Sequence, residues 1–136
     1  MASTSNDYII HLLSADRSDR VEGVTSFVGE DDSGSFAVRA RHARFITTLV
    51  FGLARFRVGR EPWQYLAVPG ALLYFDNDVL SIATRRYVVD SDYERIAEVL
   101  SEQLLKEEQG LRAMKQSLGR MEEEVMRRLW QTRRQE

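Results

Sequence analysis

Hydrophobic and polar residues alternate along much of the first 89 residues of the chain. Ala54, Phe56 and Val58 occupy one set of alternate positions, whereas Arg55 and Arg57 occupy the other. Successive side chains of a β-strand point to opposite faces. This period of two therefore predicts a strand with one buried face and one solvated face, the latter carrying the two arginines.

Nine short segments of this kind are separated by turn-forming residues such as Pro69-Gly70. The predicted strands are residues 8–13, 20–28, 35–39, 45–50, 53–58, 63–68, 71–75, 79–84 and 87–89. Many short strands joined by tight turns are typical of an antiparallel sandwich. We predict a mostly antiparallel β-sandwich domain over residues 1–89, with Trp63 in its core.

The composition changes at Asp90, where β-branched residues become scarce and helix-forming residues dominate. The sequence Ser91-Asp-Tyr-Glu94 has the form of a capping box, which predicts Ser91 as the N-cap residue. Residues 90–136 are therefore expected to form a C-terminal helical domain. Two forms remain open: one long helix over residues 92–134, or a hairpin that folds at Gln109-Gly110.

Apolar residues along this tail recur at spacings of three and four, as in a heptad seam. Such a stripe is expected to pack on a partner or on the sandwich. Trp130 stands in an otherwise charged last turn and is a candidate anchor because Trp offers a large contact area. The candidate docking residues of the tail are Leu104, Leu111, Met114, Leu118, Met121 and Trp130.

Composition and charge exclude several classes of function. The formal net charge of −2 argues against nucleic acid as the main partner, and the absence of Cys excludes disulfides and thiolate chemistry. The two His residues lack the spacing of a zinc site, and no phosphate-binding loop motif is present. The start of the chain lacks the pattern of a signal peptide, and no apolar run is long enough to insert into a membrane. A non-catalytic cytoplasmic protein is expected.

Three motifs, in order, resemble one known family. Residues 34–47 read GSFAVRARHARFIT, against a family pattern of G-E-L-G-I-x-P-G-H-A-P-L-L-T. Residues 65–72 read YLAVPGAL, similar to the family's Y-L-x-G-G-x-L, and Asp92 and Arg95 match a D-x-x-R motif at the start of the tail. Together these resemble the epsilon subunit of rotary F-type ATP synthases, over nearly the whole chain.

The resemblance implies a β-sandwich with C-terminal helices and a non-catalytic role in the central stalk. The sandwich would link the gamma subunit to the polar loops of the membrane c-ring. The tail would lie compact or extend toward the alpha/beta catalytic head, where it would regulate hydrolysis. The implied location is the cytoplasmic face of the cell membrane, as a peripheral subunit.

The resemblance also marks candidate interface residues for gamma and the c-ring: Ser35, Phe36, Arg39, Arg41, His42 and Arg44. This sequence departs from the family where Ala40-Arg41 replaces Pro-Gly and where Arg44 replaces Pro. The loop is therefore unusually basic, which favours a c-ring loop of more acidic character. These departures resemble a divergent branch of alternate bacterial ATPases, which is associated with sodium-ion pumping.

Asp92 and Arg95 help to bind a regulatory ATP in some members of the family. Here the residues that flank them in the family motif are replaced by Ser91 and Ile96. We therefore expect no ATP or other cofactor, and interpret Asp92 and Arg95 as an i,i+3 ion pair at a helix start. An alternative for the whole chain is a β-sandwich adaptor that self-associates through a C-terminal coiled coil.

Overall fold

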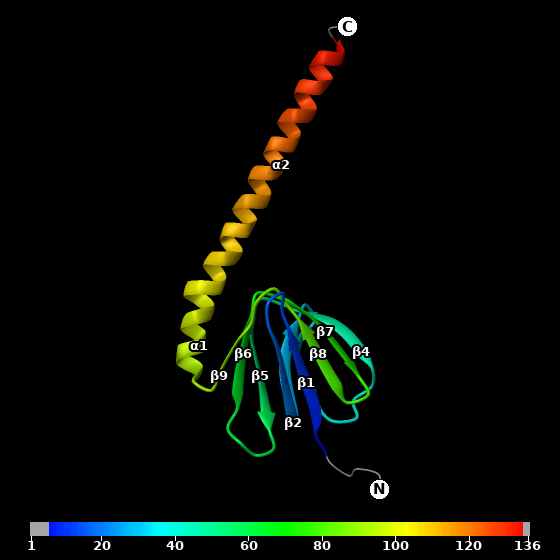
Figure 1. The fold of residues 1–136 in the computed structure, drawn as a ribbon, viewed down its shortest axis with the longest axis vertical. Helices are drawn as coiled ribbons and strands as arrows, with labels where there is room; N and C mark the ends of the chain where they lie inside the picture. Colours follow the sequence, from blue (N-terminus) through cyan, green and yellow to red (C-terminus); the bar gives the residue numbers. More distant parts are fainter. Residues whose placement is uncertain (1–5, 135–136) are drawn as a thin grey trace. The chain divides into compact units, whose positions relative to one another are not determined.

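A computed structural model describes residues 6–134 of the chain, with side chains through residue 132. The chain forms two compact units, one ending at Leu104 and the other beginning at Leu105. The first unit contains all the strands and a short helical segment, and the second is one helix (Figure 1). The two units are described separately below.

Nine strands build the first unit. They are β1 (Tyr8–Leu13), β2 (Ser18–Asp31), β3 (Gly34–Val38), β4 (Phe45–Leu49), β5 (Gly52–Val58), β6 (Gln64–Val68), β7 (Ala71–Asp76), β8 (Val79–Ala83) and β9 (Val88–Asp90). Their hydrogen-bonded order is β4-β7-β8-β1-β2-β5-β6-β9, and β3 pairs separately with β2. All neighbours are antiparallel except β1 and β8, which are parallel. The predicted sandwich of many short strands is confirmed.

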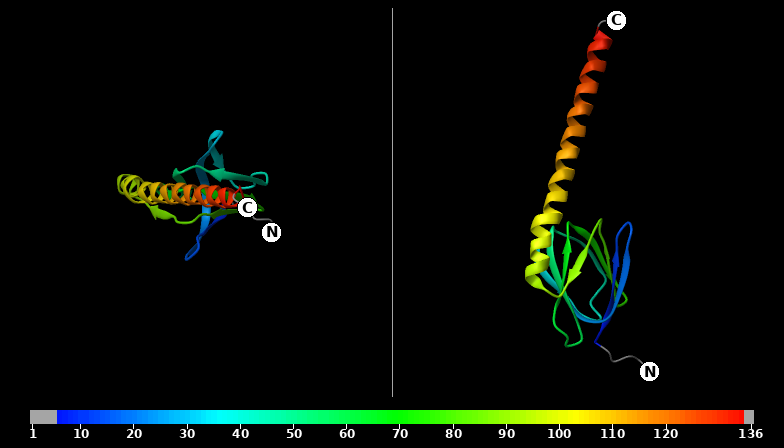
Figure 2. Two further views of the ribbon diagram at one scale, coloured as in Figure 1. Left: turned by 90° about the horizontal axis from the view of Figure 1, so that it is seen from above. Right: turned by 60° about the vertical axis from the view of Figure 1, so that its left-hand side comes forward.

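The long strand β2 joins the two layers of the sandwich, the first formed by β4, β7, β8 and β1 and the second by β3, β5, β6 and β9. Its first half pairs with β1, from Ser18 to Val24, and its second half pairs with β3 and β5. Between the halves, Gly23 adopts a φ of 73°, which glycine reaches without steric cost, and the register shifts nearby. The strands consequently curve around a common interior (Figure 2).

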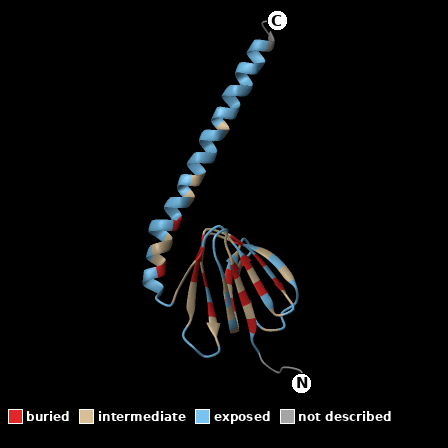
Figure 3. Ribbon diagram, in the orientation of Figure 1, coloured by how far each residue is buried: buried red, intermediate tan, exposed pale blue. Residues whose placement is uncertain are grey.

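The core lies between these two layers. Alternate residues from both layers meet there, for example Ile10 of β1, Phe75 of β7 and Phe56 of β5. Figure 3 shows the resulting alternation of buried and exposed positions along the strands. Tyr8 carries a hydroxyl into this core, and that hydroxyl donates to the carbonyl of Val38 at 2.6 Å. That bond satisfies the phenol inside the core, as burial requires.

A short helical segment covers part of the outer face of the second layer. It comprises α1 (Tyr93–Val99) and a π-helical turn, η1 (Leu100–Leu104). Ile96 and Leu104 are fully buried in a second apolar cluster with Ala67 of β6. Helix formers thus begin after Asp90, as the sequence predicts, but the compact β unit continues through Leu104. The proposed boundary between residues 89 and 90 stays a prediction.

The second unit is the single helix α2 (Leu105–Arg134). It passes through Gly110 and Gly119 without a break, so the hairpin that the sequence allowed at Gln109-Gly110 is absent from the described residues. Glycine inside a helix costs only about 1 kcal/mol, which a long helix tolerates. On the surface of α2, Glu124 and Arg128 form an i,i+4 ion pair at 2.9 Å.

The expectation that Trp63 fills the sandwich core is wrong. Trp63 is only half-buried and lies outside both apolar clusters. The guanidinium groups of Arg55 and Arg57 lie over its ring, at 4.6 and 5.6 Å from the centroid. The two arginines occupy the outer face of β5, as predicted, and Trp63 joins them there through cation–π contacts.

Candidate functional site

The basic loop of residues 39–44 connects β3 to β4, and Arg39, Arg41 and Arg44 are all exposed. Arg41 adopts a φ of 64°, in the left-handed region that disfavours side chains larger than glycine. Its backbone N–H donates to Oδ1 of Asp78 at 2.6 Å, and its guanidinium donates to Oδ1 of Asn6 at 2.6 Å. The loop is therefore fastened to the β7–β8 turn and to the residues before β1.

His42 has a partly structural role in this loop. Its Nδ1 lies 2.7 Å from the carbonyl oxygen of Ala43. The imidazole ring packs against Phe45 and Phe75, with centroid distances of 4.8 and 5.9 Å. The residue remains exposed overall, so the same side chain can anchor the loop and face a partner.

Ser35 and Phe36 point in different directions because they are adjacent in a strand. Ser35 is exposed and pairs in register with Glu30 of β2. Phe36 packs against the sandwich core, where its ring contacts those of Phe27 and Phe45 at 6.4 and 6.0 Å. Of the six predicted interface residues, Phe36 is the one whose side chain is mostly committed to the core.

The acidic turn between β2 and β3 is organised by Asp31. Its Oδ1 accepts from the backbone N–H of Ser33 at 2.9 Å, and its Oδ2 accepts from the hydroxyl of Thr47 at 2.7 Å. The hydrogen bonds from Ser33 and Thr47 lower the pKa of the Asp31 carboxyl. This link fixes β4 to the turn. Among the described residues, no group of His, Cys, Asp and Glu is arranged to hold a metal.

An exposed apolar surface covers the outer face of strands β4, β7 and β8. We call it the apolar face and define it by Ile46, Leu72, Tyr74 and Val79. Ile46 is 63% exposed and lies opposite Tyr74 in the β4–β7 register. Leu72 and Tyr74 share one face of β7, and exposed apolar side chains gathered on one face are a feature of interaction surfaces.

The sequence carried a signal for this apolar face. Residues 71–75 read ALLYF, an unbroken apolar run, whereas a strand with one wet face should alternate. In the structure Leu73 and Phe75 fill the core, while Leu72 and Tyr74 point outward. Our sequence interpretation treated the segment only as a strand and missed its second apolar face.

The start of α1 differs from the predicted capping box. The N-cap residue is Asp92, not Ser91, and its Oδ1 accepts from the backbone N–H of Arg95 at 3.2 Å. Asp90 causes the change, because its Oδ1 accepts from the N–H of Asp92 at 2.9 Å and so holds Ser91 outside the helix.

The predicted ion pair between Asp92 and Arg95 is also wrong. The guanidinium of Arg95 instead binds the carboxylate of Asp90, with Nε–Oδ2 and Nη2–Oδ1 distances of 2.6 and 2.7 Å. The hydrogen bonds from Arg95 and the N–H of Asp92 lower the pKa of Asp90 to about 2. Arg95, which the family motif would offer to a nucleotide, is thus already bound to the carboxylate of Asp90.

The predicted docking residues of the tail fall into two groups. Leu104 belongs to the first unit, where it is fully buried. Leu111 is half-buried, and four residues of α2 are mostly exposed: Met114, Leu118, Met121 and Trp130. Each helix formed by residues 6–134 is too short or too polar to span a bilayer.

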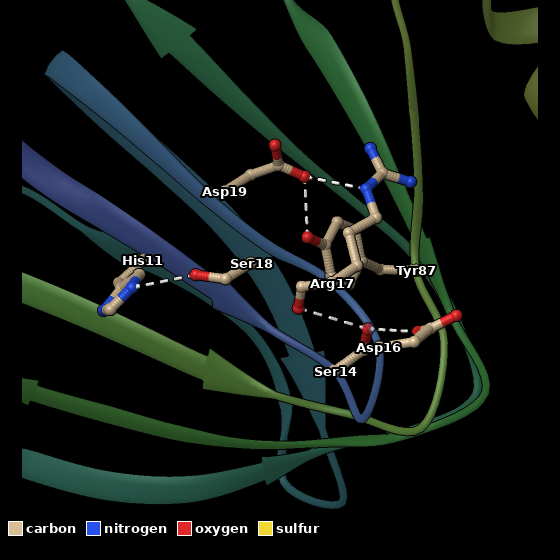
Figure 4. A network of polar contacts seen from close by, with 7 residues as sticks. All are labelled: His11, Ser14, Asp16, Arg17, Ser18, Asp19 and Tyr87. Carbon is tan, nitrogen blue, oxygen red and sulfur yellow. Dashed lines mark hydrogen bonds and ion pairs between the residues drawn. The ribbon is translucent and has the colours of Figure 1, made fainter.

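A polar network joins the β1–β2 turn to the segment before β9 (Figure 4). The hydroxyl of Tyr87 donates to Oδ2 of Asp19 at 2.6 Å, and Nε of Arg17 donates to the same oxygen at 2.9 Å. Burial, followed by the bond to Asp19, raises the pKa of Tyr87 to about 12. Nearby, the ring of His11 lies 3.4 Å from the hydroxyl of Ser18, consistent with a structural role for His11.

The chain is similar in sequence to known proteins. Residues 8–89 match the family described as ATP synthase, Delta/Epsilon chain, beta-sandwich domain. The ATP synthase epsilon chain 2 of Cereibacter sphaeroides is 28% identical over 109 residues, covering 79% of this chain and 75% of that protein.

Two solved structures are similar in fold. A chain of the Euglena gracilis mitochondrial ATP synthase aligns with a TM-score of 0.58 and 18% identity, covering 75% of this chain and 66% of that one. A chain of the Tetrahymena thermophila mitochondrial ATP synthase central stalk and c-ring aligns with a TM-score of 0.53 and 9% identity. The alignment covers 63% of this chain and 69% of that one. At these identities the likeness concerns the fold. Because the family match spans more than half of the residues, the chain belongs to the ATP synthase delta/epsilon family through its β-sandwich domain.

Proposed function

We propose that this chain is a non-catalytic central-stalk subunit of a rotary ATP synthase, with the apolar face as its binding surface for the gamma subunit. The exposed side chains of Ile46, Leu72, Tyr74 and Val79 carry this proposal. Exposure of such a surface to solvent does not stabilise a monomeric domain, whereas a stalk subunit needs a broad contact with its neighbour. The subunit would sit at the cytoplasmic face of the membrane as part of the complex.

The basic loop would contact acidic polar loops of the c-ring. Arg39 and Arg44 are exposed, and the loop leads directly into Phe45 of β4, next to Ile46 of the apolar face. Complementary charge at the rim of an interface mainly affects the rate and specificity of association. The loop would therefore select the c-ring, while the apolar face provides most of the affinity for gamma.

The binding test compares two glutamate substitutions at exposed strand positions. Ile46→Glu places a charge in the apolar face, and Ala37→Glu places one on β3, outside it. We expect the first variant to lose co-purification of gamma while retaining its thermal unfolding midpoint, and the second to retain both. Normal recovery of gamma with Ile46→Glu would refute the assignment of the apolar face.

The loop is tested by charge reversal at Arg39 and Arg44, leaving Arg41 in place because it fastens the loop. Assembly with gamma should persist, whereas ion-driven ATP synthesis should fall and become less sensitive to salt. Equal synthesis rates in wild type and the double variant at low salt would argue against a c-ring contact.

The tail would regulate hydrolysis, and the structure dictates where it should be truncated. Cutting after Asp90 removes Ile96 and Leu104 and uncovers Ala67, whereas cutting after Leu104 leaves the first unit complete. If α2 restrains hydrolysis, loss of residues 105–136 raises the hydrolysis rate of the assembled complex. An unchanged rate in an assembled complex would remove this regulatory role.

Self-association through α2 is a second candidate, favoured by the exposed residues Met114, Leu118 and Met121. Sedimentation equilibrium separates the two functions. A concentration-dependent dimer that is lost on truncation after Leu104 would support an adaptor, and a monomer at every concentration would support the stalk subunit.

A further inference from the structure

The five residues Leu100–Leu104 form a π-helical turn between two α-helical segments. In a π-helix each amide bonds to the carbonyl five residues back, so a turn takes in about one more residue than an α-helical turn. Such turns make up well under about 1% of residues in proteins and commonly lie at functional sites. This one follows α1 directly and ends where the first compact unit ends.

The turn has a clear effect on which side chains reach the sheet. Ile96, Leu100 and Leu104 are spaced by four and four residues. In a regular α-helix, at about 100° per residue, each such step drifts by about 40°, which would put Leu104 about 80° away from Ile96. The extra residue in the π-helical turn cancels most of the angular drift between Leu100 and Leu104.

Both end positions are in fact fully buried on the same apolar cluster, with Leu100 half-buried between them. Ala67 is the third fully buried residue of that cluster, and Leu53, Tyr65 and Val88 pack against it. The burial of Leu104 thus depends on the π-helical turn. No proline imposes this turn, because residues 90–136 contain none.

We propose that Leu100–Leu104 is a two-state segment: π-helical while Leu104 is seated against Ala67, and α-helical when Leu104 is released. Conversion changes the phase of every residue that follows by about one residue, or about 100° of rotation about the helix axis. The contact of Leu104 would thereby determine the direction about the helix axis in which the exposed apolar residues of α2, such as Met114, Leu118 and Met121, point. This inference stands independently of the proposed stalk function.

The hydrogen-bond pattern is the direct readout. In the full chain labelled for NMR, couplings across backbone hydrogen bonds identify the carbonyl that the amides of residues 104 and 105 contact, because these two amides close a five-residue π-helical turn at Leu100–Leu104. We expect acceptors five residues back in the wild type and four residues back in Leu104→Ser, while Leu105→Ser, at a neighbouring exposed position, retains the wild-type pattern. A π pattern that survives in Leu104→Ser, or an α pattern in the wild type, would overturn the proposal.

A pair of length variants provides a second test. Glu102 is exposed, and its deletion shortens the spacing between Leu100 and Leu104 from four residues to three, while that between Ile96 and Leu100 stays at four. An ordinary α-helix can then place both Ile96 and Leu104 against the sheet. Inserting one alanine after Glu102 lengthens the spacing between Leu100 and Leu104 to five residues and moves Leu104 off the sheet. The deletion should preserve the unfolding midpoint of the sandwich and show α-type bonding, and the insertion should lower the midpoint. Equal destabilisation by both variants would refute the mechanism.

Discussion

The guanidinium of Arg95 binds both carboxylate oxygens of Asp90, at 2.6 and 2.7 Å, and so joins the last strand to the first helix. A bidentate pair of this kind is geometrically specific and stronger than a single neutral hydrogen bond. The Asp90 side chain is largely shielded, at 16% exposure, whereas that of Arg95 is 64% exposed. The pair fixes the direction in which α1 leaves β9.

The Asp90–Arg95 pair makes stability depend on pH in the acidic range. The pKa of Asp90 is lowered in the folded chain to about 2, whereas an unfolded aspartate titrates near 4. The stabilisation is therefore complete above about pH 4 and is lost as the pH falls toward about 2. Asp90→Asn should be less stable than wild type in urea unfolding at about pH 7, and the difference should shrink across that window.

Asp32→Asn serves as the control for charge alone, since Asp32 is exposed in the β2–β3 turn. Its effect on the free energy of unfolding should be small at every pH. A gap between wild type and Asp90→Asn that is the same at about pH 2 as at about pH 7 would contradict the assignment.

The left-handed conformation of Arg41 gives a prediction about backbone strain. Arg41→Gly and Arg41→Ala both lose the bond to Asn6 and both keep the N–H that binds Asp78. They differ in steric strain at a φ of 64°, which glycine tolerates and alanine does not. The glycine variant should be the more stable of the two by roughly 1 kcal/mol in chemical denaturation. Equal stabilities would mean that the loop relaxes out of this conformation.

Gly29 is expected to tolerate no side chain. A Cβ at this position would lie 2.9 Å from Cε1 of Phe27 and 3.0 Å from Cδ2 of Leu49, both core residues. Gly29→Ala should therefore reduce the free energy of unfolding by about 1–3 kcal/mol through overpacking. Gly52→Ala is the matched control, because no described atom lies within 4 Å of its Cβ. A loss of stability at Gly52 as large as that at Gly29 would refute the packing argument.

The raised pKa of Tyr87 predicts that the folded chain loses stability at alkaline pH. This pKa is raised to about 12 by burial and by the bond to Asp19, from an ordinary value near 10. The resulting stabilisation is present below about pH 10 and is lost as the pH rises toward about 12. Tyr87→Phe should abolish this part of the alkaline dependence, whereas Tyr93→Phe, at an exposed position, should retain it. Denaturant unfolding across that range measures the effect.

The strands could be predicted from the sequence because their signal is local. All nine predicted segments overlap observed strands, and the first, β1, has the predicted bounds. The partners of β1 could not be predicted, since its parallel pairing with β8 joins residues about 70 positions apart. Likewise, no local pattern distinguishes β3, which pairs only with β2, from the strands along the main path.

The candidate site was only partly predictable for similar reasons. The basic loop is visible in the sequence, but the role of Arg41 depends on Asn6 and Asp78, which are distant along the chain. The capping box failed because Asp92 caps the helix in place of Ser91, and Asp90, which lies before the motif, accepts from the amide of Asp92. The apolar face left a signal in the unbroken apolar run of residues 71–75. The π-helical turn left none, because it depends on which residues pack against the sheet in the assembled fold.

The parallel pairing of β1 with β8 also sets an order of events during synthesis. β1 lies between β2 and β8, so one of its edges stays open until residues 79–83 have left the ribosome. Until then, a hydrophobic strand with unpaired backbone groups is available to wrong partners. The nascent chain should therefore reach its protected state only late in translation, and premature termination before Val79 should yield an aggregation-prone fragment.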